Sequence, residues 1–476
     1  MINFVFPRDF LWGVAGSAFQ MEGGMYEDGK DLNIREVAWL DAAKRSAVEH
    51  GEEKGLPELD ANWLNPESPS KFRDSRSPEV GCDFYHKYAE DIELFASLGI
   101  NTFRFSIAWS RIISDYGAEP NQAGIDYYNR VIDKMVACGI QPFMDLWHSD
   151  LPRWVLNHGG FVSDEFVSWF SRFAEVCFRE FGDRVKFWST CNEPMLNAYG
   201  PYAMAMGAPG MRDLSLGLKA AHHMVLAHFE AVRLLRKMWP DAKIGSVHNT
   251  SRYYCLSHEP ADTAAAARYQ ASQFLLCDPM ILGQYPQELL DYEPFAKNIP
   301  LAYIDELKEK FIPMDFLGLN YYQPGFVRAN DGTTYGARGF KVDLPTDAYP
   351  FRTYASGLYD LLLDLTERYN GLDLLVTENG YTQRREDVYN MDLTPFHQDT
   401  KRQEYIREHL RACQRAIRAG ATLRGYYYWS CMDVWESSMG YGYPMGLVAV
   451  NFDTLERVPR ESFYYYQRIV KNNTVD

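Results

Sequence analysis

One repeating unit constrains the fold of this chain more than any other feature. An amphipathic helical stretch ends at glycine or proline, and a short apolar run follows within a few residues, as at Leu98-Gly99 before residues 101–106. Glycine after a helix provides its left-handed cap, and apolar runs between helices are typical of parallel strands covered by helices. With one further run near the start, eight segments are expected to be strands: 10–14, 101–106, 141–145, 185–190, 243–247, 315–320, 374–377 and 426–429.

Eight βα units predict an α/β fold, a single (β/α)8 TIM barrel with extended βα loops. A length of 476 residues divided by about 150 would suggest about three domains, but a barrel with insertions can exceed about 400 residues. No linker or tandem repeat divides the chain, so we expect one domain over 1–476. Residues 34–49 have a helical pattern within 31–80, which we expect to be the loop after the first strand. A doubly wound open sheet is the alternative fold.

The net charge of the chain argues against several classes of partner. The sequence has 48 Lys and Arg against 64 Asp and Glu, a formal charge of −16, which repels nucleic acids and anionic membranes. It has no run of about 18 apolar residues and no signal-peptide pattern at its start. Its eight cysteines are dispersed, without a C-x-x-C pair. We therefore expect a cytoplasmic protein that binds a small molecule, neither a nucleic acid nor a membrane, as a monomer or a homo-oligomer.

Motifs for nucleotides and metals are incomplete in this sequence. Residues 24–31 nearly match the phosphate-loop pattern, but Asp31 replaces its final Ser or Thr, so we interpret them as a turn-rich loop. The three histidines within 222–228 share a helical stretch without the i,i+4 spacing of metal ligands. No G-x-G-x-x-G, G-x-S-x-G or H-E-x-x-H motif occurs. The sequence therefore predicts neither a metal nor an organic cofactor.

Polar or aromatic side chains lie within or directly after six of the eight expected strands. In a barrel the carboxyl ends of all strands open on one face, where enzymes of this fold place their catalytic residues. The residues in question are Arg104, His148, Asn192-Glu193, Asn320-Tyr321-Tyr322, Glu378 and Trp429.

Two of these residues are glutamates, and they follow the fourth and seventh expected strands. A single Glu at a strand end is usually a cap or a solvated side chain, but two from opposite sides of a barrel mouth indicate paired chemistry. Cleavage of a glycosidic bond needs one acid to protonate the leaving oxygen and one carboxylate to attack or to activate water. Arg104 beside one carboxylate would keep it ionised as a nucleophile, although a purely structural ion pair is the alternative.

Seven ordered motifs resemble those of glycoside hydrolase family 1, the β-glucosidase type of retaining (β/α)8 enzymes. The resemblance covers essentially the whole chain, and its specificity comes from the order and spacing of the motifs together. The motifs are 6–7 with 10–13, 17–23, 103–109, 147–148, 190–194, 320–322 and 377–380.

The resemblance implies a role for each matching residue. It makes Glu193 the acid/base and Glu378 the nucleophile of double displacement, and it implies a cis peptide bond at Trp429–Ser430. The residues implied to bind the glycone are Asn192 at the 2-hydroxyl, Gln20 and His148 at the 3- and 4-hydroxyls, Glu436 at the 4- and 6-hydroxyls, and Trp429 as an aromatic floor. The residues implied to surround the nucleophile are Arg104, Asn320 and Tyr322.

The rim of the expected site departs from the family pattern. Ser149 and Ser437 stand where the family usually has tryptophan, and Phe351 takes the place of an expected tryptophan near the aglycone. The loop 440–445 contains no Lys or Arg, although the family usually places a Lys-Arg pair there. We therefore expect Phe351, Trp435 and Ser437 to form an unusual aglycone rim.

These observations predict a retaining β-glycosidase, most simply a β-glucosidase. It would hydrolyse neutral β-glycosides or short β-linked oligosaccharides from the non-reducing end. Three alternatives remain: a 6-phospho-β-glycosidase, a transglycosidase on the same scaffold, and a catalytically silent sugar-binding protein. A 6-phosphate on the substrate would need basic side chains to bind it, which Arg338 or Arg352 could provide from another loop.

Overall fold

Eight parallel strands close into a barrel in the computed structural model, which describes residues 5–40, 77–392, 394–396, 398–436 and 440–476. Their order around the barrel is β1-β11-β10-β7-β5-β4-β3-β2, so each strand has two neighbours and no edge is left open. This confirms the predicted (β/α)8 TIM barrel, and the open-sheet alternative is wrong. The strands are β1 (Leu11–Ala15), β2 (Thr102–Ser106), β3 (Gln141–Asp145), β4 (Phe187–Asn192), β5 (Lys243–Asn249), β7 (Phe316–Asn320), β10 (Asp373–Asn379) and β11 (Leu423–Trp429).

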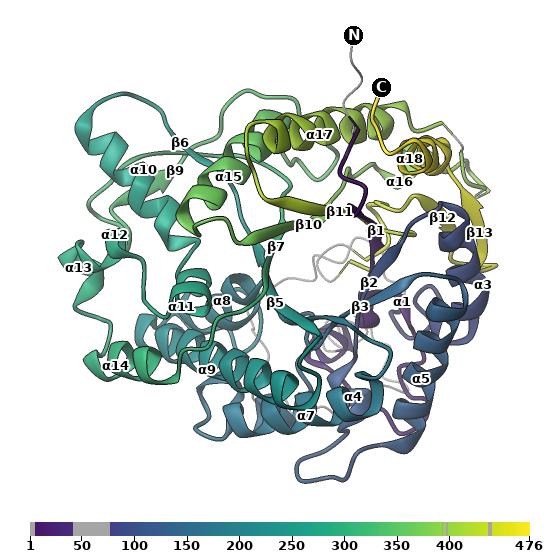
Figure 1. The fold of residues 1–476 in the computed structure, drawn as a ribbon, viewed down its shortest axis with the longest axis horizontal. Helices are drawn as coiled ribbons and strands as arrows, with labels where there is room; N and C mark the ends of the chain where they lie inside the picture. The colour runs from purple at the N-terminus through teal and green to yellow at the C-terminus, as the bar shows by residue number, and fades with distance from the viewer. Residues whose placement is uncertain (1–4, 41–76, 393, 397, 437–439) are drawn as a thin grey trace, which may run out of the picture.

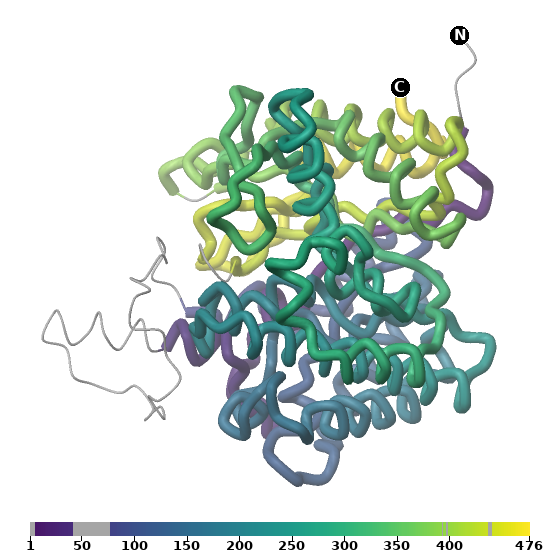
Figure 2. The backbone as a smooth tube through the Cα atoms, turned by 90° about the vertical axis from the view of Figure 1, so that its left-hand side faces the viewer, coloured from purple at the N-terminus to yellow at the C-terminus, as the bar shows by residue number. Residues whose placement is uncertain are grey.

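Long helices surround the barrel (Figure 1), and Figure 2 shows α7 and α9 on the side opposite to α15 and α17. Most of them are amphipathic, and α9 begins at an N-cap, since the Asp213 side chain accepts hydrogen bonds from the backbone nitrogens of Ser215 and Leu216. The long helices are α3 (Phe84–Ser97), α5 (Gln122–Ala137), α7 (Phe166–Phe181), α9 (Leu214–Met238), α10 (Pro260–Ser272), α14 (Leu301–Lys310), α15 (Ala355–Arg368), α17 (Thr400–Arg418) and α18 (Glu461–Asn472).

Short elements fill the extended loops between strands and helices. Residues 34–40 are helical, and the rest of the helix expected over 34–49 lies outside the described residues. The short helices are α1 (Ala18–Met21), α4 (Trp109–Ile112), α6 (Arg153–Asn157), η2 (Gly160–Val162), the π-helical turn η3 (Met195–Tyr199), α8 (Gly200–Ala203), α11 (Cys277–Leu282), α12 (Gln287–Leu290), α13 (Glu293–Ala296) and α16 (Arg385–Val388). The outer strands are β6 (Tyr253–Cys255), β8 (Gly325–Ala329), β9 (Ala337–Gly339), β12 (Val448–Asn451) and β13 (Glu456–Pro459).

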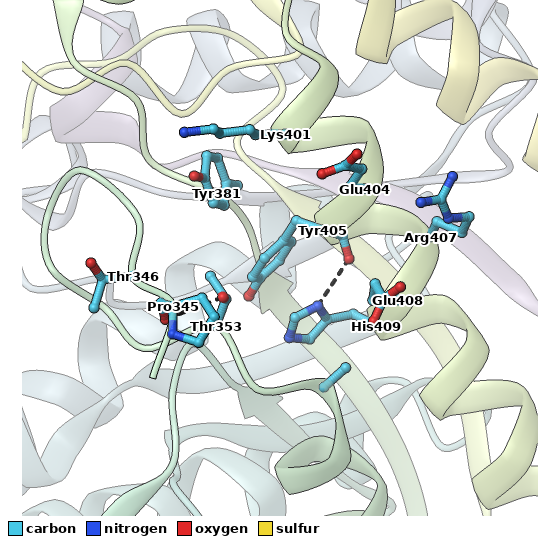
Figure 3. Close-up of a pocket in the computed structure, with 11 residues that line it drawn as sticks. Pro345, Thr346, Thr353, Tyr381, Lys401, Glu404, Tyr405, Arg407, Glu408 and His409 are labelled. Atoms are coloured by element: carbon cyan, nitrogen blue, oxygen red, sulfur yellow. Dashed lines mark hydrogen bonds between the residues drawn. The ribbon is translucent and has the colours of Figure 1, made fainter. Parts of the chain in front are cut away.

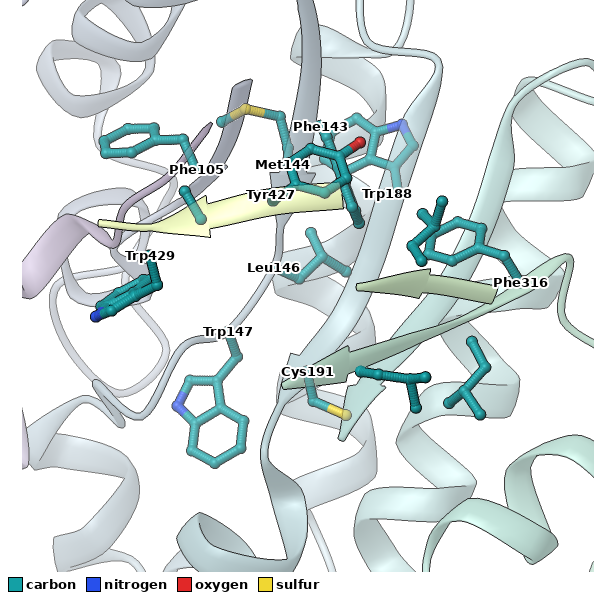
Figure 4. Close-up of a cluster of buried hydrophobic side chains, with 14 of the residues drawn as sticks. Phe105, Phe143, Met144, Leu146, Trp147, Trp188, Cys191, Phe316, Tyr427 and Trp429 are labelled. Carbon is teal, nitrogen blue, oxygen red and sulfur yellow. The ribbon is translucent and has the colours of Figure 1, made fainter. Parts of the chain in front are cut away.

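Large aromatic side chains fill the inside of the barrel (Figure 4). The ring of Phe143 lies 5.5 Å from that of Phe316 and 5.5 Å from that of Tyr427, both nearly edge to face. Tyr427 leaves no room for a side chain at Gly13, where a Cβ would lie 2.3 Å from the tyrosine ring. The barrel interior is therefore a packed core, and the polar site lies above it at the carboxyl ends of the strands.

Two strands carry one extra residue directly before their carboxyl ends. Between the pairs Ser189–Gly245 and Asn192–Val247, the chain advances by three residues on β4 but by two on β5. Between the pairs Val376–Leu319 and Glu378–Asn320, the chain advances by two residues on β10 but by one on β7. An extra residue of this kind is a β-bulge, which re-aims the side chains after it.

The two ends of the described chain lie together. The backbone nitrogen of Phe6 donates to the carbonyl oxygen of Asn473 at 2.9 Å, and Trp12 Nε1 donates to Asn473 Oδ1 at 2.8 Å. Within the described ranges, no helix is both long enough and apolar enough to cross a membrane.

Candidate active site

Glu378, at the carboxyl end of β10, accepts a strong hydrogen bond at each carboxylate oxygen. Arg104 Nη1 lies 2.7 Å from Oε1, and Tyr322 Oη lies 2.7 Å from Oε2. Arg104 is fully buried and Glu378 is 4 % exposed, so water screens these contacts little. Burial raises the pKa of Tyr322 well above its usual value, as does the charge of Glu378, so the phenol keeps the proton that it donates. This environment suits an ionised carboxylate.

Arg104 also contacts Asp145, a buried carboxylate at the end of β3 that the sequence reasoning missed. Its Nη2 lies 2.5 Å from Asp145 Oδ2 and 2.7 Å from Asn192 Oδ1. Burial alone would lower the pKa of Arg104, but the charges of Asp145 and Glu378 raise it above its usual value, so the guanidinium stays cationic. An acidic residue at a strand end, three positions before His148, was the available signal.

Glu193 follows β4 and has a different environment from Glu378. Its backbone has a φ of 51°, a left-handed conformation that is uncommon for a residue with a side chain. Asn320 Nδ2 donates to its Oε1 at 2.8 Å, and the side chain of Asn249 also donates to it. Burial, followed by the charge of Glu378, raises the pKa of Glu193 to about 7. The carboxyl group can therefore hold a proton near neutral pH.

Asn249 is a further site residue that the sequence reasoning missed. The fifth strand was expected to end at Val247, but β5 continues to Asn249 and pairs with β7 to its end. The shorter expected strand left this asparagine outside the site. The polar run after Val247 was the only sequence signal.

Asn320 links the surroundings of the two glutamates. Its Nδ2 lies 2.9 Å from Asn192 Oδ1 as well as 2.8 Å from Glu193 Oε1, and its Oδ1 accepts a hydrogen bond from Thr377 Oγ1 at 2.9 Å. Because Asn192 also contacts Arg104, a continuous set of hydrogen bonds joins Glu193 to Glu378. Residues from four strands are held in one rigid arrangement.

The residues expected to bind a glycone lie beside this network. His148 stacks on Trp429 with ring centres 5.6 Å apart and planes 13° from parallel, and its Nε2 lies 3.2 Å from Asn192 Nδ2. Glu436 accepts hydrogen bonds from the side chains of Trp429 and Gln20. The structure thus brings these five residues together. It also contains the cis peptide bond expected at Trp429–Ser430.

Glu436 is electrostatically close to the nucleophile candidate. Burial, followed by the charge of Glu378, raises the pKa of Glu436 to about 7. Hydrogen bonds from Trp429 and Gln20 act in the opposite direction and favour the ionised form. Glu436 therefore presents a hydrogen-bonded carboxyl group to the same part of the site as Glu378.

The rim residues have three different outcomes. Phe351 stacks on Tyr322 with ring centres 5.4 Å apart, which places it beside the nucleophile candidate. Trp435 is fully buried and packs edge to face on Phe19 at 6.2 Å, so its place on the rim stays a prediction. Ser437 lies outside the described residues.

A comparison with known families gives this geometry its context. Residues 2–475 match the sequence model described as "Glycosyl hydrolase family 1". The chain belongs to glycosyl hydrolase family 1. The resemblance stated from the motifs is therefore confirmed, and the chain is a glycosyl hydrolase.

Relatives of this family 1 hydrolase match it along nearly the whole chain. It is 34 % identical over 478 residues to "Beta-glucosidase A" of Acetivibrio thermocellus, covering 99 % of this chain and 100 % of the relative. It is also 34 % identical over 486 residues to "6-phospho-beta-glucosidase GmuD" of Bacillus subtilis, covering 98 % of each. The solved structure of a family 1 β-glucosidase from Thermotoga maritima in complex with isofagomine lactam has a TM-score of 0.87 and 33 % identity, covering 99 % of this chain and 100 % of that one.

A hollow of about 350 Å³ lies between α17 and the loop before α15 (Figure 3). None of the expected site residues lines it. Tyr405, which does, accepts a hydrogen bond from Asn379 Nδ2 at 2.8 Å, and Asn379 is the neighbour of Glu378 in the chain. Burial lowers the pKa of His409, which stacks on Tyr405, to about 4. This family 1 hydrolase therefore has a buried, neutral aromatic cluster behind its nucleophile candidate.

The incomplete phosphate-loop motif and the histidines within 222–228 make ordinary structural contacts. Lys30, in the segment that nearly matches a phosphate loop, pairs with Glu36 at 2.7 Å. The histidines within 222–228 have separate partners: Glu306 for His222, the carbonyl of Phe161 for His223, and Thr190 for His228. Among the described residues, no group of three or more His, Cys, Asp or Glu side chains could hold a metal ion.

Proposed function

We propose that this hydrolase is a retaining β-glucosidase that cleaves neutral β-glucosides or short β-linked oligosaccharides from the non-reducing end. The observation that supports this most is the unequal pair of carboxyl groups. Glu378 has a cation and a phenol donor on its two oxygens, whereas the pKa of Glu193 is raised to about 7. Two carboxyl groups whose environments differ in this way can act as nucleophile and acid.

In the proposed reaction, Glu378 attacks the anomeric carbon while Glu193 gives its proton to the leaving oxygen. The bond to the aglycone breaks, and a covalent glycosyl-enzyme forms on Glu378. Glu193, now ionised, takes a proton from water, which attacks the same carbon and releases the sugar with its original configuration. Arg104 and Tyr322 hold the nucleophile in place and stabilise its charge when it leaves the sugar.

Binding of the glycone follows from the residues around the two glutamates. Asn192, Gln20, His148 and Glu436 offer hydrogen-bonding groups to the sugar hydroxyls, and Trp429 offers an aromatic face. The proposal includes neither a metal nor an organic cofactor, because the two carboxyl groups supply the proton and the nucleophile. A cytoplasmic location and the oligomeric state stay predictions.

A 6-phospho-β-glycosidase is the second candidate, because a relative named "6-phospho-beta-glucosidase GmuD" is 34 % identical. Charge near the expected position of the 6-hydroxyl favours the neutral sugar. Glu436 stands there, and the described loop 440–445 contains no Lys or Arg. Of the two basic residues considered for a cradle, Arg338 is exposed on β9, and Arg352 donates to Gln323 and to the carbonyl of Val342.

A panel of nitrophenyl β-glycosides, with and without a 6-phosphate, tests the proposal directly. We expect the β-glucoside to be cleaved fastest, and proton NMR during the first turnovers to show β-glucose as the initial product. Release of α-glucose would contradict retention. No nitrophenol release from any member would favour the silent sugar-binding protein, and products longer than the substrate would favour the transglycosidase.

A further inference from the structure

Arg35 reaches from the first turn of the helix at 34–40 to the loops that follow β3 and β4. Its Nε donates to the carbonyl oxygen of Ser149 at 3.2 Å, and its Nη2 donates to Asn197 Oδ1 at 2.7 Å. Ser149 follows the glycone candidate His148 in the chain. The backbone nitrogen of Asn197 donates to the carbonyl oxygen of Glu193 at 3.0 Å. The guanidinium is therefore fixed beside the proposed acid.

The charge of Arg35 has no counter-ion among the described residues, since no carboxylate there lies within 4.0 Å of it. Both of its acceptors are neutral. The fully buried arginines differ, because each has a carboxylate oxygen within 3.2 Å: Arg104, Arg111, Arg402 and Arg460. Removing a charge from water without a partner costs free energy, and a ligand of opposite charge would recover part of that cost at Arg35.

The nearby acidic groups do not neutralise Arg35. Burial lowers the pKa of Arg35, while the charges of Asp150 and Glu193 act in the opposite direction at longer range. Asp150 is itself fully buried, which raises its pKa well above the usual value and weakens it as a counter-ion. Glu193 is protonated when it is ready to act as an acid. A positive charge thus remains available to a ligand.

One arm of the guanidinium is left without a hydrogen bond within the described ranges. Nη1 has no acceptor among the described residues, and a Cβ added to Gly207 would lie 3.8 Å from it, at ordinary contact distance. Ser149 is shorter than the tryptophan that the family usually has beside His148, and its hydroxyl has no partner in the described part of the chain. Because Glu193 gives its proton to the leaving oxygen, groups on this side of Glu193 face the leaving group.

We propose that Arg35 is a specificity-determining residue that binds a carboxylate on the leaving group of the substrate, next to Ser149. This inference rests on the proposed β-glucosidase function and narrows its substrate class. The preferred substrates are β-glucosides whose aglycone carries an acidic group, either an aromatic acid or a uronic acid. Arg35 donates two N–H groups to this carboxylate, and the hydrolysis itself proceeds through Glu193 and Glu378.

The test compares two substrates that differ by one charge: the β-glucoside of 4-hydroxybenzoate and that of its methyl ester. In Arg35→Gln we expect the ratio of kcat/KM for the acid to that for the ester to fall about 10- to 100-fold, mainly through KM of the acid. Arg35→Lys should keep part of the preference, because it keeps the charge but loses the planar fork. A Gln variant that lowers both substrates equally, or neither, would exclude an aromatic acid as the carrier of the carboxylate.

Arg352→Gln is the matched control, since Arg352 also donates only to neutral acceptors but lies next to Phe351. It should leave the acid-to-ester ratio of kcat/KM unchanged. A fall of this ratio in Arg352→Gln instead of in Arg35→Gln would contradict the assignment.

Glucose β-linked to glucuronate, compared with cellobiose, forms a second arm of the test. A loss of preference in either arm supports the proposal and identifies the carrier of the carboxylate, and a loss in neither overturns it. If wild type cleaves no β-glucoside but cleaves another β-glycoside, the proposed function fails, and the same pairs made with that glycone still test Arg35.

Discussion

Asn320 donates a hydrogen bond of 2.8 Å to Glu193, the group whose pKa is raised to about 7. The donor favours the ionised form, while burial and Glu378 favour the protonated form. The pKa of the proposed acid is therefore a balance that neighbouring amides can shift.

The high-pH side of the activity profile should follow this balance. Glu193 must be protonated to act as an acid, so kcat/KM should fall as the pH rises through about 7. Asn249→Val removes a donor that lowers the pKa of Glu193, so this fall should move to higher pH. Thr250→Val is the control, because among the described residues Thr250 Oγ1 bonds only the carbonyl oxygen of His248, and the pH profile of this variant should match wild type. A fall that moves to lower pH in Asn249→Val would contradict the assignment.

Exchange of the two glutamates should have distinct consequences. Glu378→Gln should abolish turnover of every substrate. Glu193→Gln should lower kcat about 10²- to 10⁴-fold for methyl β-glucoside, whose leaving group needs a proton, and far less for dinitrophenyl β-glucoside. Steady-state kinetics on the two substrates measure this difference, and equal losses would refute the role of Glu193.

A crystal structure should show the two carboxyl groups about 5–5.5 Å apart, as retention requires, whereas about 8 Å would indicate inversion.

The buried ion pair of Arg104 with Asp145 should contribute to stability as well as to catalysis. Arg104→Met leaves Asp145 and Glu378 buried without their cation, and we expect the free energy of unfolding to fall by about 3–5 kcal/mol. Adding Asp145→Asn should restore part of this loss, because the pair is coupled. Urea unfolding of the single and double variants measures the coupling, and strictly additive losses would show that the two residues are independent.

A second pair provides the control for that measurement. Arg233 and Glu230 are in contact at 2.6 Å, but both are exposed at the surface of α9. Arg233→Met should change the free energy of unfolding by no more than about 0.5 kcal/mol. A comparable loss in the free energy of unfolding at both pairs would mean that the buried ion pair stabilises the fold no more than the exposed one.

The charge of Glu436 should favour neutral sugars over 6-phosphates. We expect kcat/KM for the neutral nitrophenyl β-glucoside to be far higher than for its 6-phosphate. Glu436→Gln should lower the neutral-sugar value about 10- to 100-fold, because it removes a charged acceptor for sugar hydroxyls. Glu404→Gln, which changes a carboxylate lining the separate hollow beside α17, should change neither value. A faster reaction with the phosphate would contradict this interpretation of Glu436.

The barrel strands were predictable because their signals are local. Seven of the nine long helices are followed within three residues by a glycine or a proline, and the apolar run that comes next is typical of a covered parallel strand. The two glutamates were found for the same reason, since they stand directly after such runs. Asp145 and Asn249 were not found, because a polar residue at a strand end is a site residue only when other strands bring partners to it. Arg104, from β2, is the partner of Asp145, and Glu193, which follows β4, is the partner of Asn249.

The surroundings of Trp435 show what a local pattern leaves out. Its position in the family motif suggested a place on the rim, but Phe19, a residue far away in the sequence, packs against its ring. Burial of an aromatic residue in a loop depends on contacts that no local pattern contains. The side-chain exposure of loop residues therefore needed the structure.

The extra residues on β4 and β10 shift the alternation by which successive side chains face the inside and the outside of the barrel. Along an ordinary strand, Glu378 would face the same way as Val376, out toward the helices. The single inserted step at Thr377 turns it inward, level with Asn320, while the pairing on both sides continues. The same residues paired step for step with β7 would carry the carboxylate to the helix side, so the position of the nucleophile depends on the register of the pairing as much as on the identity of the residues.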